Sequence, residues 1–214
     1  MAGSCSHTHA ASTQRYRNVL WGVLIINAVM FAVEIIYGIS AKSVSLLADS
    51  LDFLGDAANY GISLFVLNKA LTMRAKASLI KGATIGVFGL WIFGTTIWQF
   101  LAGDLPNYHQ MGVIGVLAFV ANVVSAVMLY AFREGDSNMR GVWLCSRNDA
   151  LGNIAVVAAG VAVYFTQSNL PDLVVALLMS LLALQAAWAI VRQAKGELND
   201  EKPADNHSSC GHSH

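Results

Sequence analysis

Residues 43–59 read SVSLLADSLDFLGDAAN, an apolar segment interrupted by three aspartates. Asp49, Asp52 and Asp56 stand at positions i, i+3 and i+7, so an α-helix places all three on one face. A charged side chain at the centre of a lipid-facing helix costs about 2.5–3.5 kcal/mol on insertion scales. If this segment crosses a membrane, its acidic face must therefore point into a polar interior formed by other helices.

The rest of the chain has the composition of an integral membrane protein. Hydrophobic residues make up 56% of its 214 residues and charged residues 12%, which is about half the charged share of an ordinary soluble domain. A soluble domain of this size would need a charged surface, and most of the chain offers none. The composition also excludes a disordered chain, and three cysteines are too few and too scattered for a disulfide framework.

Six apolar segments are each long enough to cross a hydrocarbon core of about 30 Å as a helix. They are residues 19–41, 44–67, 77–102, 111–132, 141–166 and 170–191. The short alternating strands that would indicate a closed barrel are not seen in the sequence. The predicted fold class is therefore all-α, an integral membrane protein with six transmembrane helices.

Basic residues are concentrated in alternate connectors. They precede the first segment, separate the second from the third and the fourth from the fifth, and follow the sixth, whereas the other connectors hold only Lys42. The positive-inside rule then predicts that both termini are cytoplasmic, and a bacterial inner membrane is the expected location. Lysine plus arginine and aspartate plus glutamate number 13 each, so no nucleic-acid partner is expected.

The predicted domain organisation is a cytoplasmic tail over residues 1–17, a transmembrane transport domain over residues 18–195 and a second tail over residues 196–214. Both tails contain metal-ligating residue types, and weak metal binding is the hypothesis for them. These residues are His7, His9, His207, Cys210, His212 and His214. The alternative is that the tails are disordered polar ends.

Polar residues also follow helical spacing in three other segments. They are Asn27 and Glu34 in the first segment, Asn122 in the fourth, and Cys145, Asp149 and Asn153 in the fifth. The third and sixth segments have little polar character inside. This distribution predicts a core of four helices around a central site, with two helices to the side.

Asp52 and Asp56 from one helix, with Cys145 and Asp149 from another, make a four-ligand set. Oxygen and sulfur ligands in a tetrahedral site suit zinc, and the thiolate argues against magnesium or calcium. Protons compete with the metal, because ligands bind metal only when they are deprotonated. If Cys145 is not a ligand, Asn153 or water could complete the shell. No cofactor is expected apart from the transported metal.

Other polar residues are assigned supporting roles. A second shell or a proton path is the hypothesis for a group of five, with capping of a helix end as the alternative for Asp49. The five are Asp49, Asn27, Glu34, Asn122 and Asn153. Asp172 follows Pro171 at the start of the sixth segment, the usual place of a helix N-terminal acid, which favours a structural role. Gly82, Gly86 and Gly89 could admit another helix closely, within the chain or at a dimer face.

Two motifs resemble the cation diffusion facilitator family. Ala48-Asp49-Ser50 followed by Asp52 and Asp56 resembles the family's second helix, and Cys145 followed by Asp149-Ala150-Leu151-Gly152 resembles its fifth. The resemblance implies a divalent-cation/proton antiporter whose transmembrane site matches these aspartates and Cys145. Three departures matter: a cysteine stands at the usual histidine or aspartate position, residues 69–81 hold no histidine, and the chain has the form expected of a member without the C-terminal cytoplasmic domain.

The predicted function is export of a divalent metal from the cytoplasm by proton antiport with alternating access. Zinc is the expected metal, with cadmium, cobalt or iron as alternatives, and the expected partners are the metal, protons and the lipid bilayer, with a homodimer left open. The main alternative is a metal-binding membrane sensor or assembly factor without transport. A transporter of organic cations is disfavoured because Trp91 and Trp98 lie off the acidic stripes. An enzyme is not expected, because no nucleophile–base pair, phosphate loop or HExxH motif is visible.

Overall fold

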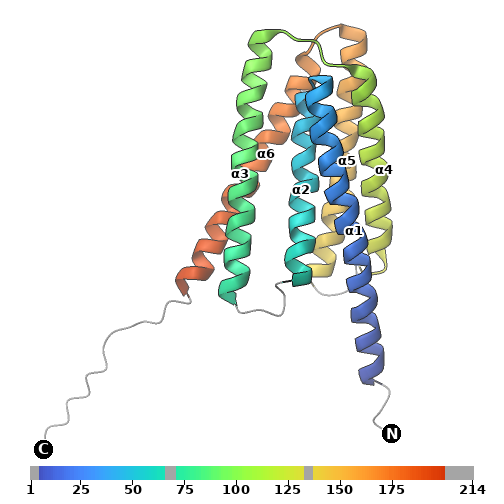
Figure 1. Ribbon diagram of the computed structural model, residues 1–214, viewed down its shortest axis with the longest axis vertical. Helices are drawn as coiled ribbons and strands as arrows, with labels where there is room; N and C mark the ends of the chain where they lie inside the picture. Colours follow the sequence, from blue (N-terminus) through green and yellow to red (C-terminus); the bar gives the residue numbers. More distant parts are fainter. Residues whose placement is uncertain (1–4, 66–70, 133–136, 201–214) are drawn as a thin grey trace, which may run out of the picture.

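The structure is a computed structural model that describes residues 5–65, 71–132 and 137–200, with side chains described except at residues 5–13, 71, 74, 137–145 and 200. Within these ranges the chain forms six long α-helices and no β-strand (Figure 1). They are α1 (Cys5–Ala41), α2 (Val44–Phe65), α3 (Leu71–Ala102), α4 (Tyr108–Tyr130), α5 (Ser137–Thr166) and α6 (Leu170–Asp200). The predicted all-α fold class is confirmed.

The outer surface of this bundle is apolar. Large hydrophobic side chains such as Leu101, Phe165 and Trp188 are among the most exposed, and five of the helices are long and apolar enough to span a membrane. The exception is α2, which contains the three aspartates. An exposed apolar surface around buried polar residues is the arrangement that a lipid environment favours, and the chain is a multi-pass integral membrane protein.

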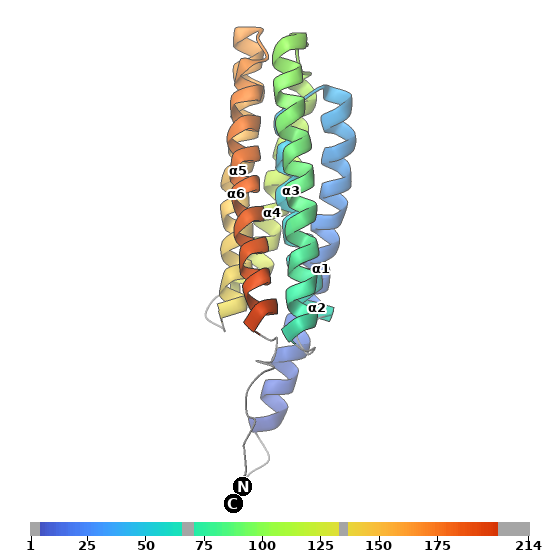
Figure 2. The same cartoon turned by 90° about the vertical axis from the view of Figure 1, so that its left-hand side faces the viewer.

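The helices pack as three neighbouring pairs, α1 with α2, α4 with α5, and α3 with α6 (Figures 1 and 2). Helix α2 contacts each of the other five, whereas α3 packs mainly against α6 and α2 and meets α1 through the ring pair of Phe31 and Phe88. The buried polar network links α1, α2, α4 and α5, as the polar stripes predicted, whereas α3 and α6 contribute apolar residues such as Ile92 and Leu173 to the core. The α3–α6 pair lies to the side and diverges from α2 towards the end where α1 begins (Figure 1).

Small residues allow α3 to approach α6 closely. A Cβ atom added at Gly82 would lie 2.9 Å from Val191 Cγ2 and 3.3 Å from the Ala187 carbonyl oxygen. One at Gly89 would lie 3.2 Å from a Leu184 methyl group. The predicted close approach at these glycines is therefore confirmed within the chain, between α3 and α6.

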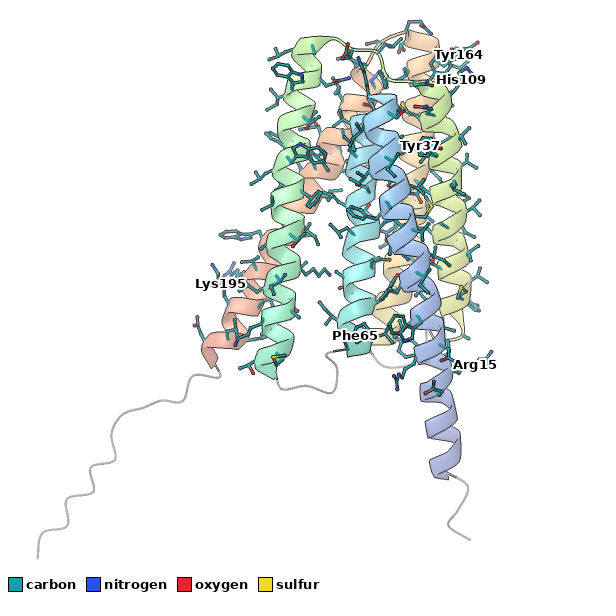
Figure 3. All side chains as sticks on the ribbon, viewed as in Figure 1. Arg15, Tyr37, Phe65, His109, Tyr164 and Lys195 are labelled. Carbon is teal, nitrogen blue, oxygen red and sulfur yellow. The ribbon has the colours of Figure 1, made fainter. Side chains whose placement is uncertain are left out.

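The two ends of the bundle differ in charge. Helix α1 begins and α6 ends at the same end (Figure 2). Arg15 and Lys195 lie towards that end, and His109 and Tyr164 lie at the opposite one (Figure 3). At that opposite end Lys42 forms a salt bridge of 3.0 Å with Asp104. The charge distribution follows the positive-inside pattern, although the cytoplasmic placement of the termini stays a prediction.

Helix α1 begins at Cys5, well before the apolar segment that predicted it. Adding a residue to an existing helix costs far less free energy than nucleating a new helix. The membrane-spanning part of α1 can therefore extend into the polar sequence before it. The side chains of His7 and His9 lie outside the described ones. Residues 201–214, which contain the other predicted tail ligands, lie outside the described residues, so both tail hypotheses stay predictions.

A buried carboxylate joins α6 to the beginning of α2. The Asp172 side chain is fully buried and accepts hydrogen bonds from the amides of Val44 (2.8 Å) and Ser45 (3.2 Å). It also accepts bonds from the hydroxyls of Ser43 (2.7 Å) and Ser45 (2.6 Å). The predicted structural role of Asp172 is confirmed, but the acid caps the neighbouring helix α2.

Candidate metal centre

Asp56 is held by two hydroxyl groups. It is almost completely buried on α2, and its Oδ2 accepts hydrogen bonds from Tyr60 Oη, one turn further along α2, and from Ser146 Oγ at 3.5 Å on α5. The two hydroxyls are themselves 2.8 Å apart. Because both contacts fall on Oδ2, they orient the carboxylate without using the lone pairs of Oδ1.

Asp149 and Asp52 complete a cluster of carboxylates between α2 and α5. The Asp149 carboxyl lies close enough to Asp56 to share a hydrogen bond when one of the two carries a proton, and it lies within electrostatic range of Asp52. Asp52 Oδ2 points towards α5, 3.9 Å from where a Cβ atom would stand on Gly152. Asp52 and Asp149 are each partly accessible, unlike Asp56. The structure thus brings the three predicted aspartates together at one helix interface.

The fourth predicted ligand, Cys145, lies within α5, but its side chain is outside the described ones. Among the described side chains, no three of the types His, Cys, Asp and Glu are close enough together to enclose a metal ion. The four-ligand set of Asp52, Asp56, Cys145 and Asp149 therefore stays a prediction. Coordination at this interface would require the three carboxylates to move closer together around the ion.

A second polar network lies beside this cluster and connects four helices. Asn153 on α5 donates a hydrogen bond of 2.7 Å to Asp49 Oδ2 on α2, and Asn122 on α4 donates one of 2.9 Å to Asn153 Oδ1. Glu34 on α1 lies beside Asp49. Asp49 does not cap α2, whose first amides bind Asp172. Asn27 is also buried, and its amide donates to the Val23 carbonyl oxygen at 2.7 Å.

Two contacts of this centre were not predicted from the sequence. Tyr60 stands four residues after Asp56, and Ser146 stands three residues before Asp149. The first spacing places Tyr60 on the face of Asp56, which it contacts, and the second places Ser146 on the face of Asp149, although the acid that Ser146 contacts is Asp56 on α2. Helical spacing could therefore have placed both residues near the acidic cluster. Serine and tyrosine hydroxyls are common in structural roles, so the sequence alone did not single them out. Only the packing of α2 against α5 brings both hydroxyls to Asp56 Oδ2.

A lysine lies beside the acidic cluster on the side of α3. Lys81 Nζ donates a hydrogen bond to Asn59 Oδ1, one turn from Asp56 on α2. Its ammonium group is within electrostatic range of the Asp56 carboxylate. Lys81 also lines an open, mainly apolar cavity of about 400 Å³ between the diverging parts of α2 and α3. A fixed positive charge therefore stands where this cavity approaches Asp56.

Replacing Lys81 by glutamine is expected to tighten binding of zinc about five- to tenfold, because it removes a charge that repels a dication at Asp56. The change would be measured as the dissociation constant for zinc in detergent at fixed pH. Lys76→Gln is the matched control, since Lys76 is exposed on the same helix. Equal affinities in wild type and Lys81→Gln would show that the lysine charge does not act on the metal centre.

Comparison with known proteins places this arrangement in a family. The cation efflux transmembrane domain matches residues 20–198. The chain is 26% identical to zinc transporter ZitB of Pectobacterium atrosepticum over 217 residues, covering 95% of this chain and 67% of the relative. It is 25% identical to metal cation efflux system protein CzcD of Cupriavidus metallidurans, covering 96% of this chain and 68% of the relative.

A third relative is the cadmium, cobalt and zinc/H(+)-K(+) antiporter of Bacillus subtilis, which is 24% identical over 80% of this chain and 61% of its own length. The family match includes α2 to α5, most of α1 and α6, and both of the motifs that carry the aspartates. The chain belongs to the cation efflux family.

Proposed function

We propose that this protein exports a divalent metal cation, with zinc as the main substrate, in exchange for protons. The observation that carries the proposal is the convergence of Asp52, Asp56 and Asp149 between α2 and α5, inside a bundle with an apolar surface. Several carboxylates this close together in a low-dielectric interior need a dication or protons to balance their charge. The relatives named as zinc transporters support the choice of metal.

Exchange follows from the chemistry of the ligands. A carboxylate oxygen that holds a proton no longer binds metal well, so metal and protons compete for the same atoms. A side of the membrane with more protons would release the metal, and a side with fewer would load it. We therefore expect zinc affinity to fall as pH falls.

Access from the cytoplasm would run along the cavity between α2 and α3, which is lined by Phe65 at the end of α2 and by Ala77 near the start of α3. At the other end α1, α3, α4 and α6 are joined through their connectors. The Asn107 amide donates to the Ala41 carbonyl oxygen at 2.8 Å, and Asn169 donates to the Gln99 carbonyl oxygen at 3.2 Å. Alternating access would require the α3–α6 pair to move relative to the four-helix core.

Metal flux in proteoliposomes tests this proposal. Zinc, cadmium, cobalt and manganese would be compared under an imposed pH gradient, with wild type beside Asp52→Asn and Cys145→Ser. We expect zinc flux that depends on the gradient and is lost in Asp52→Asn, and a changed metal preference in Cys145→Ser if sulfur is a ligand. Tight zinc binding without flux would instead identify a metal sensor or an assembly factor and would overturn the transport proposal.

A further inference from the structure

Glu34 and Asp49 form a buried pair of carboxyl groups outside the aspartate cluster. Both side chains are 0% exposed, and their carboxyls are close enough for one to hydrogen-bond the other when it carries a proton. Among the described residues, neither oxygen of Glu34 has a hydrogen-bond partner, and neither has Asp49 Oδ1. Three carboxyl oxygens therefore meet in the dry interior between α1 and α2 without a donor.

The groups around this pair do not neutralise it. Amides face it from the other helices, with Asn153 donating to Asp49 Oδ2 and Asn122 donating to Asn153. The titratable groups within electrostatic range are acids, Asp52 on α2 and Asp149 on α5. Asn122 Oδ1, itself buried, is a further acceptor without a donor. A buried carboxylate is stable only when it is paired, hydrogen-bonded or protonated, so this pair requires a cation.

We propose that Glu34 and Asp49 form a second cation site that takes the monovalent counter-ion of transport, separate from the Asp52, Asp56 and Asp149 centre. The ligands are carboxyl and amide oxygens, which suit a proton or an alkali cation better than a soft metal. The site is also drier than the metal centre, whose Asp52 and Asp149 are partly accessible. This inference rests on the proposed function and adds to it a second binding place for the exchanged ion, beside the competition of protons for the metal ligands themselves.

The two sites are adjacent, which would couple them. Asp49 stands one turn before Asp52 on α2, and Asn153, the donor to Asp49, stands one turn after Asp149 on α5. A cation at Glu34 and Asp49 repels a dication at the metal centre and competes for the same local negative charge. Loading the second site would therefore weaken metal binding, and loading the metal centre would expel the counter-ion, as exchange requires.

The test separates metal binding from its coupling to the counter-ion. Glu34→Gln and Asp49→Asn keep the shape of each side chain and remove its charge. Glu197→Gln is the matched control, because Glu197 lies near the end of α6 and accepts a hydrogen bond from Gln193 on the same helix. Zinc affinity would be measured by calorimetry in detergent, and zinc flux in proteoliposomes under a pH gradient or a potassium gradient, each imposed alone. The two gradients distinguish a proton from an alkali cation.

We expect one gradient to accelerate zinc flux in wild type and in Glu197→Gln. In Glu34→Gln and Asp49→Asn that acceleration is expected to fall at least about fivefold, while zinc affinity stays within about threefold of wild type. Full acceleration in both variants would overturn the inference, as would loss of zinc binding, which would make these residues part of the metal centre. The inference would also be overturned if neither gradient accelerated zinc flux in wild type. The absence of any zinc flux would overturn the proposed function itself.

Discussion

Asp56→Asn is expected to lower zinc affinity at least about a hundredfold and to abolish zinc flux. Changes to residues that only orient a metal ligand already cost about 10–100-fold, and Asp56 is expected to be a ligand itself. Asparagine keeps the shape of the side chain and an oxygen that can accept from Tyr60 and Ser146. The fold of α2 against α5 should therefore survive while the charge that attracts the metal is lost. Calorimetry in detergent and flux in proteoliposomes would measure the two effects.

Asp104→Asn is the control for this experiment, because Asp104 is exposed and pairs with Lys42 at the end of the bundle where α1 ends and α2 begins. It changes the same functional group far from the centre and should leave zinc binding intact. Asp149→Asn is expected to behave like Asp56→Asn, since the two carboxyls are neighbours between α2 and α5. Wild-type zinc affinity in both Asp56→Asn and Asp149→Asn would exclude the interface of α2 and α5 as the metal centre.

The part of this centre that the sequence could predict is the part that helical spacing determines. The spacing of Asp49, Asp52 and Asp56 determines that they share a face, and the cost of charge in lipid determines that this face points inward. The same reasoning placed Asp149 and Asn153 on the facing side of α5. These arguments hold without knowledge of the connectors, because a membrane restricts helices to nearly parallel packing.

Spacing does not determine how two helices rotate and slide against each other. The sequence grouped Asp49 with Asn153 and Glu34 as supporting residues, but it could not show that Asn153 donates to Asp49 while both Glu34 oxygens lack a donor. The sequence likewise did not indicate that Lys81, near the start of the third apolar segment, approaches the acidic face. In the structure it lies on α3 beside Asn59 because the α3–α6 pair packs against α2 on that side.

The anchoring of α2 by Asp172 gives the second large effect. The first amides of a helix have no partner within the helix, and in α2 two of them, from Val44 and Ser45, bind the Asp172 carboxylate. A carboxylate at a helix N-terminus also interacts favourably with the helix dipole. The site is buried on the side of α6, so water cannot easily replace the acid. Asp172 therefore fixes the end of the helix whose other residues form the metal centre.

Asp172→Ala is expected to lower the free energy of unfolding by at least about 2 kcal/mol, because each stranded buried donor costs about 1–3 kcal/mol. For a domain of this size that corresponds to a fall of about 4–8 °C in the midpoint of thermal unfolding, followed by tryptophan fluorescence in detergent. Asp172→Asn should lower the free energy of unfolding by less, since its amide oxygen still accepts a hydrogen bond. Asp104→Asn is the control and should leave the midpoint close to that of wild type. Zinc affinity well below the midpoint should be retained in Asp172→Ala, because Asp172 contacts the beginning of α2 and none of the three aspartates. An unchanged midpoint together with lost zinc binding would show that Asp172 acts on the ion and is not the anchor of α2.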